Sequence, residues 1–332
     1  MIDSNAKLVA EILNPDKLEQ QPTRNGYGVG LVRAGEENDQ VVVLCADLTD
    51  STRSQGFKDK FPERFIEMGV AEQNMASVAS GMAAVGKIPF ISSYAAFSPG
   101  RNWEQIRTNI CYNESNVKIG GAHAGVSVGP DGATHQAIED IATMRVLANM
   151  TVLVPCDAVE AEKATLAAAR FSGPVYLRFA REKTPVMTTS DTPFEIGKAQ
   201  KFWESKYPKV AIIACGPLVH NALLAAAELE QEGIGSLVIN MHTIKPLDET
   251  AVIEAATACG AVVTVEEHQI IGGLGGAVAE LLAKHCPTPM EFVGVQNRFG
   301  ESGEPTELIK HFGMAPEHIA AAAKSSISKK RQ

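Results

Sequence analysis

A lone carboxylate stands at the junction of two predicted elements in residues 65–86, FIEMGVAEQNMASVASGMAAVG. The stretch before Gly69 is typical of a strand, and the stretch after it is typical of a helix. Glu72 would lie near the N-terminus of that helix, where the helix dipole favours its charge and desolvation favours its proton. It is therefore a candidate acid or base. The alternative is a structural glutamate that accepts hydrogen bonds from the first amides of the helix.

The helix that follows Glu72 has two different faces. Its apolar positions have the spacing of a face packed on a sheet and are Met75, Val78, Ala79 and Met82. The other positions are rich in Ala, Ser and Gly, which favour close contact over solvation. We therefore expect both sides of the helix to be covered, the second side at a subunit interface.

A long loop over residues 123–135, HAGVSVGPDGATH, combines His123 and His135 with Asp131. Imidazoles near a carboxylate suit proton transfer to sugar hydroxyls or carbonyls at neutral pH. The alternative is a mobile glycine loop with solvated histidines. The two histidines lack the i, i+4 spacing of a helical zinc pair, so no metal site is predicted.

Other polar and aromatic residues occur at the predicted ends of elements. Tyr94 and Phe97 could stack on a flat heterocycle, although such a pair is commonly part of a core. Arg24, Ser51 and Arg181 could bind phosphate through a guanidinium fork and a hydroxyl, although each alone could be a surface residue.

Alternating strands and helices must position these residues. The expected strands of the first half are 41–46, 65–69, 88–92, 117–120, 151–154 and 175–179, and its expected helices are 26–34, 70–86, 103–112, 136–148 and 158–170. The second half has expected strands 210–215, 236–241, 261–266 and 291–295 and expected helices 218–231, 248–259 and 276–285. The pattern predicts two doubly wound α/β domains with mainly parallel sheets over residues 21–185 and 194–325, after a helix and linker over 1–20. In such sheets ligands bind at the carboxyl ends of strands, which makes the turn over 47–52 a natural site.

The overall composition narrows the class of protein. The 332 residues are 45% hydrophobic and 21% charged, with a net charge of −9 and no basic block before the final KKRQ. Nucleic acid and anionic membranes are therefore not expected as partners. The N-terminal residues do not resemble a secretory signal and no run is long enough to span a membrane, so a cytoplasmic location is expected.

Two other sequence features are assigned structural roles. The six cysteines form no CxxC pair and are expected to be buried free thiols. The glycine-rich run 272–276 has Val278 where a dinucleotide fingerprint needs its third glycine. Close packing at the start of a helix is the favoured interpretation of that run.

Taken as a set, seven segments resemble the C-terminal half of transketolase. They are PERFIEMGVAEQNM, SSYAAFS, GVSVGPDGATHQAIEDIA, RFAREKTPV, TIKPLD, VEEH and GGLGGAVAE, and the resemblance extends from Pro22 to about Gly313. The half of that family that binds diphosphate and magnesium has no counterpart in this sequence. The resemblance therefore implies the pyrimidine-binding and C-terminal-domain subunit of a split transketolase.

The resemblance also implies roles for residues that would bind thiamine diphosphate. Glu72 matches the glutamate that hydrogen-bonds N1′ of the aminopyrimidine, and this bond makes the imino nitrogen available for removal of the C2 proton. Phe97 matches the ring that stacks on the pyrimidine, and Tyr94 stands where the family often has phenylalanine. Asp47 matches an aspartate near the cofactor. The stretch 98–103 departs from the family pattern by about one residue, so the shape of the entrance is not implied.

For the substrate, the resemblance implies a sugar phosphate. His123, Asp131 and His135 match residues that bind the hydroxyls and the C1 carbonyl region of a ketose, with catalytic roles for the two histidines. Arg24, Ser51 and Arg181 match the residues that bind the phosphate at the far end. The expected reaction is transfer of a two-carbon ketol unit between phosphorylated sugars.

The resemblance implies a specific assembly. An N-terminal subunit would bind the diphosphate and provide most of the contacts to Mg²⁺. The active enzyme would be a heterotetramer, and this chain alone would be inactive. The β chain of a 2-oxo acid dehydrogenase, a fragment of deoxyxylulose-phosphate synthase and a non-enzymatic α/β module that binds a partner remain alternatives. The three residues of the phosphate set and the loop with its DGATH run favour a sugar phosphate over a short 2-oxo acid.

Overall fold

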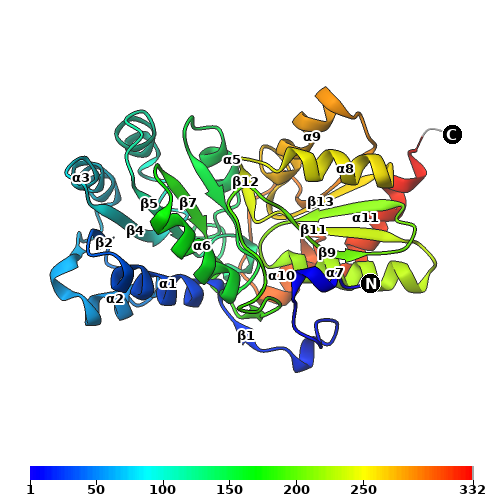
Figure 1. Ribbon diagram of the computed structural model, residues 1–332, viewed down its shortest axis with the longest axis horizontal. Coiled ribbons are helices and arrows are strands. Elements are labelled where there is room, and N and C mark those ends of the chain that lie inside the picture. Colours follow the sequence, from blue (N-terminus) through cyan, green and yellow to red (C-terminus); the bar gives the residue numbers. More distant parts are fainter. Residues whose placement is uncertain (331–332) are drawn as a thin grey trace.

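The structure is a computed structural model that describes residues 1–330. Two α/β domains lie side by side, each built on its own sheet (Figure 1). This arrangement confirms the predicted fold class of two doubly wound domains with mostly parallel sheets.

The first sheet has seven strands in the order β12-β6-β7-β5-β4-β2-β3. Their bounds are β2 Val41–Cys45, β3 Phe65–Glu67, β4 Ile88–Tyr94, β5 Lys118–Ala122, β6 Thr151–Leu153, β7 Val175–Arg178 and β12 Thr243–Lys245. All neighbours are parallel except β12 and β6. The central strands are buried on both faces, which explains the continuous apolar run of β2.

Helices cover both faces of this sheet. One face packs against α1 (Thr23–Glu37) and α6 (Ala158–Arg170), with α2 (Gln55–Lys60) alongside α1. The two long helices cross closely, because a Cβ atom on Gly26 would stand 1.8 Å from the carbonyl oxygen of Ala158. Glycine is therefore required at this crossing.

The opposite face packs against α3 (Glu72–Ala84), the segment 103–111 and α5 (Asp140–Arg145). On α3 the buried residues include Met75, Ala76, Ala79 and Ser80, whereas Val78 is 37% exposed. The predicted apolar stripe is thus wrong at Val78, because the buried face is centred on the small residues between Met75 and Ser80. Its cover by another subunit remains a prediction.

The second sheet has five strands in the order β14-β13-β10-β11-β9. Their bounds are β9 Gln200–Glu204, β10 Val210–Ala214, β11 Ser236–Asn240, β13 Val262–Gln269 and β14 Met290–Val295, and only β9 is antiparallel to its neighbour. Helices α7 (Leu218–Gln231) and α11 (Pro316–Ser328) pack on one face, and α8 (Glu249–Cys259) and α9 (Leu274–His285) pack on the other. The short helix α10 (Pro305–His311) lies against the loop 126–131 of the first domain.

Several predicted elements need correction. The predicted N-terminal helix is wrong: residues 1–20 contain the 3₁₀ turns Ser4–Ala6 and Pro15–Lys17, because Lys7 adopts a left-handed φ of 52° and Pro15 follows an extended residue. Strand β1 (Gln20–Gln21) then pairs with β8 (Thr184–Pro185).

Three predicted helices differ clearly in extent or type from the observed ones. The helix predicted over 26–34 is longer, since α1 runs from Thr23 to Glu37. The helix predicted over 136–148 is shorter, since residues 136–137 are held by the loop before it, where Ala137 bridges Ala124. The helix predicted over 103–112 begins as α4 (Trp103–Gln105) and continues as a π-helix over Ile106–Cys111.

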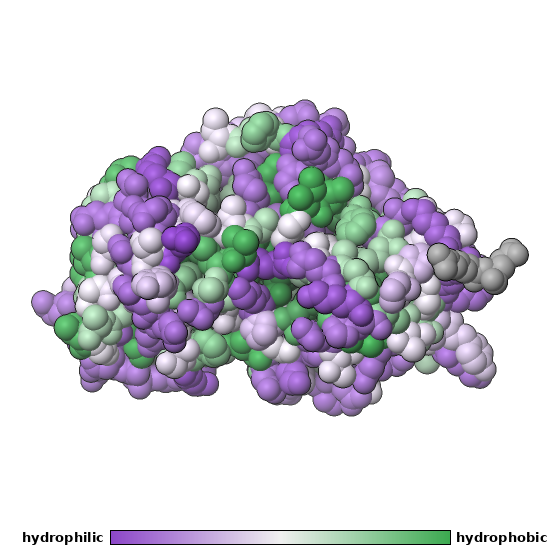
Figure 2. Space-filling view, turned by 90° about the horizontal axis from the view of Figure 1, so that it is seen from above, coloured by the Kyte–Doolittle hydropathy of each residue, from purple (hydrophilic) through white to green (hydrophobic). Residues whose placement is uncertain are grey.

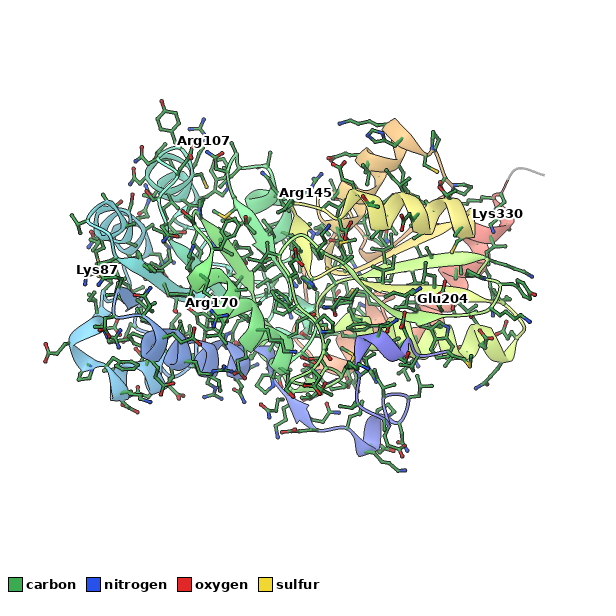
Figure 3. All side chains as sticks on the ribbon, viewed as in Figure 1. Lys87, Arg107, Arg145, Arg170, Glu204 and Lys330 are labelled. Atoms are coloured by element: carbon green, nitrogen blue, oxygen red, sulfur yellow. The ribbon has the colours of Figure 1, made fainter. Side chains whose placement is uncertain are left out.

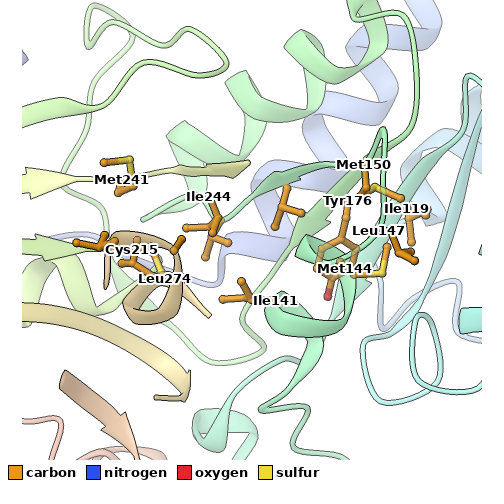
Figure 4. Close-up of a cluster of buried hydrophobic side chains, with 14 of the residues drawn as sticks. Ile119, Ile141, Met144, Leu147, Met150, Tyr176, Cys215, Met241, Ile244 and Leu274 are labelled. Atoms are coloured by element: carbon orange, nitrogen blue, oxygen red, sulfur yellow. The ribbon is translucent and has the colours of Figure 1, made fainter. Parts of the chain in front are cut away.

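The two domains share a continuous core. Strand β12 leaves the second domain and joins the edge of the first sheet, where Thr243 pairs with Leu153. Figure 4 shows part of the apolar cluster that spans both domains, including Ile141, Met144 and Leu274. Figure 3 labels Arg145 at the same junction. This side chain donates to the carbonyl oxygen of Gly272 (3.1 Å) and forms an ion pair with Glu280.

The remaining observations concern the surface, membrane-spanning segments and the cysteines. Hydrophobic groups are interspersed with hydrophilic ones on the face shown in Figure 2. Across residues 1–330 no helix is both long and apolar enough to cross a membrane. All six cysteines are free thiols, and every one except the partly exposed Cys286 is buried.

Candidate active site

Glu72 is the first residue of α3 and its side chain is 1% exposed. Its Oε1 accepts a hydrogen bond from the Ser93 hydroxyl (3.2 Å), and its Oε2 forms an ion pair with Nη1 of Arg101 (2.8 Å). The side-chain amide of Asn102 donates to the Glu72 backbone carbonyl (3.1 Å). The structure therefore places a carboxylate in a dry site with one cation beside it, and each oxygen retains capacity for another donor.

Four rings form one aromatic group beside this carboxylate. Tyr94, at the end of β4, stacks on His123 with centroids 3.8 Å apart and on Phe97 with centroids 5.9 Å apart. The His135 ring meets Phe97 edge-on at 5.5 Å. The guanidinium carbon of Arg101 lies 5.0 Å from the Phe97 centroid. The aromatic pair thus connects the carboxylate region to the two histidines.

A second group of residues brings three arginines together, and of these only Arg24 forms no ion pair within residues 1–330. Arg24 donates from Nη1 to the backbone carbonyl of Ser51 (2.7 Å) and lies 3.3 Å from Nε2 of His123. Burial, and the nearby Arg53 and Arg181, lower the pKa of Arg24. Three guanidinium groups close enough to repel one another make this a favourable place for an anion.

His123 is buried and neutral within this cationic group. Burial and the charge of Arg24 lower its pKa to about 3, with a further contribution from Arg181. Because Arg24 can only donate, Nε2 of His123 must accept and the proton lies on Nδ1. Among the contacts of residues 1–330, Nδ1 of His123 and Nε of Arg24 have no hydrogen-bond partner. Both are buried polar atoms whose hydrogen-bonding capacity the described part of the protein leaves unused.

The remaining predicted residues surround this group. Arg181 donates to the carbonyl oxygen of Val128 (2.5 Å) and lies 3.9 Å from a carboxylate oxygen of Asp131. Nδ1 of His135 is 2.9 Å from the Thr134 hydroxyl. The structure thus brings the predicted phosphate residues and the predicted loop residues into one region.

Asp47 is less directly connected to the others. It is exposed, has a left-handed φ of 57°, and donates its amide to Oε1 of Glu67 (2.7 Å). Glu67 also accepts from the Thr49 hydroxyl (3.0 Å) and the Gly69 amide (3.1 Å). Glu67 therefore holds together the two strand ends that carry Asp47 and lead to Glu72.

Sequence reasoning missed Arg53 and Arg101. Arg53 lies two residues after Ser51 in the same turn, so its position beside a candidate phosphate residue was an available signal. Arg101 lies four residues after Phe97, but nothing local in the sequence indicated that it pairs with Glu72.

A cavity of about 480 Å³ lies beside the aromatic group. The turn that follows β4 and the end of the histidine loop line it, through Ala96, Trp103 and Thr134 among others. Its lining includes none of the predicted site residues, so the cavity and the predicted site do not coincide. Within the part of the chain that the structure describes, no three His, Cys, Asp or Glu residues are grouped as a metal site.

The fold and the site together define an α/β protein with a cluster of arginines and a buried carboxylate at the carboxyl ends of parallel strands. Residues 19–187 match the family model "Transketolase, pyrimidine binding domain", and residues 197–319 match "Transketolase, C-terminal domain". The chain belongs to the transketolase family, which confirms the resemblance inferred from its sequence.

The most informative relatives are separate subunits or sections. The chain is 43% identical to a provisionally named transketolase C-terminal section of Methanocaldococcus jannaschii, over 90% of this chain and 93% of that protein. It is 40% identical to the 6-deoxy-6-sulfo-D-fructose transketolase subunit SqwH of a Clostridium species, over 92% and 95%. A solved structure described as a split gene transketolase, inactive beta4 tetramer, matches with 46% identity and a TM-score of 0.87, over 93% of this chain and 99% of that one. By contrast, the chain spans about half the length of the mammalian transketolases that it matches.

Proposed function

We propose that this chain is the pyrimidine-binding and C-terminal subunit of a split transketolase. It is active only with a partner that binds the diphosphate and provides most of the contacts to Mg²⁺. The nearly full-length match to a split gene transketolase chain and to a transketolase subunit supports this division. The expected active assembly is a heterotetramer. The solved split gene transketolase is an inactive beta4 tetramer, which agrees with a chain that lacks activity alone.

The burial of Glu72 beside the Tyr94–Phe97 pair is the observation on which the proposed chemistry depends. When bound, thiamine diphosphate would supply a nucleophilic carbon for ketol transfer. Glu72 has spare acceptor capacity and would hold a proton at N1′ of the pyrimidine. Phe97 and Tyr94 would present flat surfaces to the ring and exclude water from it. Asp47, at the adjacent strand end, would lie near the cofactor.

The sugar would bind on the cationic side of the aromatic group. Arg24, Ser51 and Arg181 would bind its terminal anion, and the unpartnered Nε of Arg24 and Nδ1 of His123 are donors without a protein acceptor. His123, His135 and Asp131 would bind the hydroxyls and the C1 carbonyl region. Because His123 is neutral, it donates to a sugar oxygen without adding charge to the site.

Two anions suit the cationic region on chemical grounds. Phosphate and sulfonate both offer oxygen acceptors to guanidinium groups. We propose a sugar phosphate as the substrate, and the sulfosugar named for the Clostridium relative provides a comparison. The preferred anion is decided by measurement of both.

The test is reconstitution with the N-terminal subunit, thiamine diphosphate and Mg²⁺. Xylulose 5-phosphate and ribose 5-phosphate would be supplied, and 6-deoxy-6-sulfofructose would be supplied in a parallel reaction. We expect ketol transfer only when both subunits are present. Decarboxylation of a 2-oxo acid without ketol transfer would instead support the dehydrogenase alternative. Formation of deoxyxylulose phosphate from pyruvate would support the synthase alternative.

A further inference from the structure

The second domain makes hydrogen bonds at three places to the histidine loop (residues 123–135) and to Gln136, which follows it. Oε1 of Glu267 accepts from the Ser127 amide (2.6 Å). The Ser302 hydroxyl donates to the carbonyl oxygen of Pro130 (2.7 Å). The carbonyl oxygen of Glu301 accepts from Nε2 of Gln136 (2.8 Å). These contacts use backbone atoms or the adjoining glutamine, so they do not engage the histidine rings.

Glu267 lies in β13 and is 3% exposed. Gly125 has a φ of 91°, and a Cβ atom there would stand 2.3 Å from the Glu267 carboxylate. The loop backbone is therefore packed directly onto this side chain. Only glycine permits both the left-handed backbone and this close approach.

The side chain of Gln136 also makes hydrogen bonds within the histidine loop. Its Nε2 also approaches the carbonyl oxygens of Val126 (3.0 Å) and Gly129 (3.3 Å). The carbonyl oxygen between them, that of Val128, accepts from Arg181. The segment between residues 126 and 130 thus has little freedom to move independently of the second domain.

Arg178 holds β13 against the first domain. This buried guanidinium donates from Nε to Oδ2 of Asp140 (2.8 Å) and from Nη2 to the carbonyl oxygen of Glu267 (2.8 Å). The hydroxyl of Tyr176 also donates to Asp140 (2.6 Å). The strand that bears Glu267 is therefore fixed relative to the first sheet as well as to its own.

We propose that the second domain sets the position of the histidine loop, with Glu267 as the principal positioning residue. The proposal rests on the proposed function in so far as this loop binds the sugar. Small displacements of groups that bind a reacting substrate have large effects on rate, so the loop requires such external support. The second domain thereby contributes to substrate binding without contacting the substrate.

The direct test is amide hydrogen exchange of the full chain, with Glu267→Ala compared with Glu266→Ala. Glu266 is equally buried but accepts from the amides of Leu274 (2.7 Å) and Gly275 (2.8 Å) within its own domain. In Glu267→Ala we expect exchange over residues 124–134 to be about tenfold faster or more, because a charge-assisted hydrogen bond is lost. In Glu266→Ala we expect exchange to change around α9 and not in the loop.

Two milder variants keep the test informative if an alanine variant fails to fold. Glu267→Gln keeps an acceptor oxygen and should show exchange close to wild type. Ser302→Ala should accelerate exchange near Pro130 by several-fold while leaving the melting temperature nearly unchanged. Wild-type exchange in the loop of Glu267→Ala or of Ser302→Ala, or equal acceleration by Glu266→Ala, would overturn the proposal.

A second readout uses the reconstituted enzyme. Glu267→Ala should raise KM for the sugar substrate by about tenfold while the affinity for thiamine diphosphate stays unchanged, because only the loop is displaced. A weakened affinity for the cofactor with an unchanged KM would contradict loop positioning. Since the exchange experiment needs no activity, absence of ketol transfer would refute the proposed function without affecting this test.

Discussion

Replacing Glu72 by glutamine separates its proposed chemical role from its structural role. In the structure, one carboxylate oxygen accepts from Ser93 and the other pairs with Arg101. A glutamine side chain can direct its oxygen towards Arg101 and its amide nitrogen towards Ser93, whose hydroxyl can also accept. Both contacts survive, so the chain should still fold.

The expected loss of stability is small. Only the charge-assisted part of the Arg101 bond is lost, which amounts to about 1–2 kcal/mol. Arg101 is about half exposed and can be solvated by water after the substitution. For a chain of this size the melting temperature should fall by only a few degrees.

The expected chemical effect is much larger. Glutamine cannot take part in proton transfer at N1′, so exchange of the C2 proton of bound thiamine diphosphate should slow by about 10²- to 10⁴-fold. The assay is deuterium exchange at C2 in the complex with the N-terminal subunit, stopped with acid and read by NMR. Glu104→Gln is a matched control, because that exposed carboxylate contacts only neighbouring residues of its own segment. An exchange rate equal in wild type and Glu72→Gln would refute the role of Glu72.

Three further outcomes follow from the site. Arg24→Ala should weaken binding of the sugar phosphate by about 10- to 100-fold. The control Arg170→Ala removes an exposed ion pair with Glu37 and should leave this binding unchanged. Equal KM values for the two variants would exclude Arg24 from the anion site. Arg101→Ala should tighten cofactor binding in the reconstituted enzyme, because Arg101 contacts the Phe97 ring and the Glu72 carboxylate where the pyrimidine is proposed to bind. A weaker affinity would show that Arg101 supports the bound pyrimidine instead of competing with it. Burial lowers the pKa of His123 and of His242 to about 3, so their contribution to stability should be complete above pH 6.5 and decline as the pH falls from there towards 3. Urea unfolding between pH 7.5 and 4.5 measures this decline, and an unchanged free energy of unfolding would contradict it.

Local sequence patterns predicted much of the fold because helices and buried strands have distinct hydrophobic periods. Helices α6 and α7 begin and end at the predicted residues. The glycine-rich run before α9 was correctly assigned to packing at a helix start, although β13 continues to Gln269 and shortens the connection to four residues. Edge strands β9 and β12 were not predicted, because their pairing partners are set by distant parts of the chain.

The sequence by itself determined the family, the two α/β domains and a set of candidate site residues, because these depend on residue type, local spacing and recognisable segments. Only the tertiary structure decided that Arg101 pairs with Glu72, that Arg53 stands near Arg24 and His123, and that Glu267 supports the histidine loop. These contacts join residues from 29 to 140 positions apart through packing and the orientation of side chains. Such orientations are set by the assembled core, which no local period of the sequence encodes.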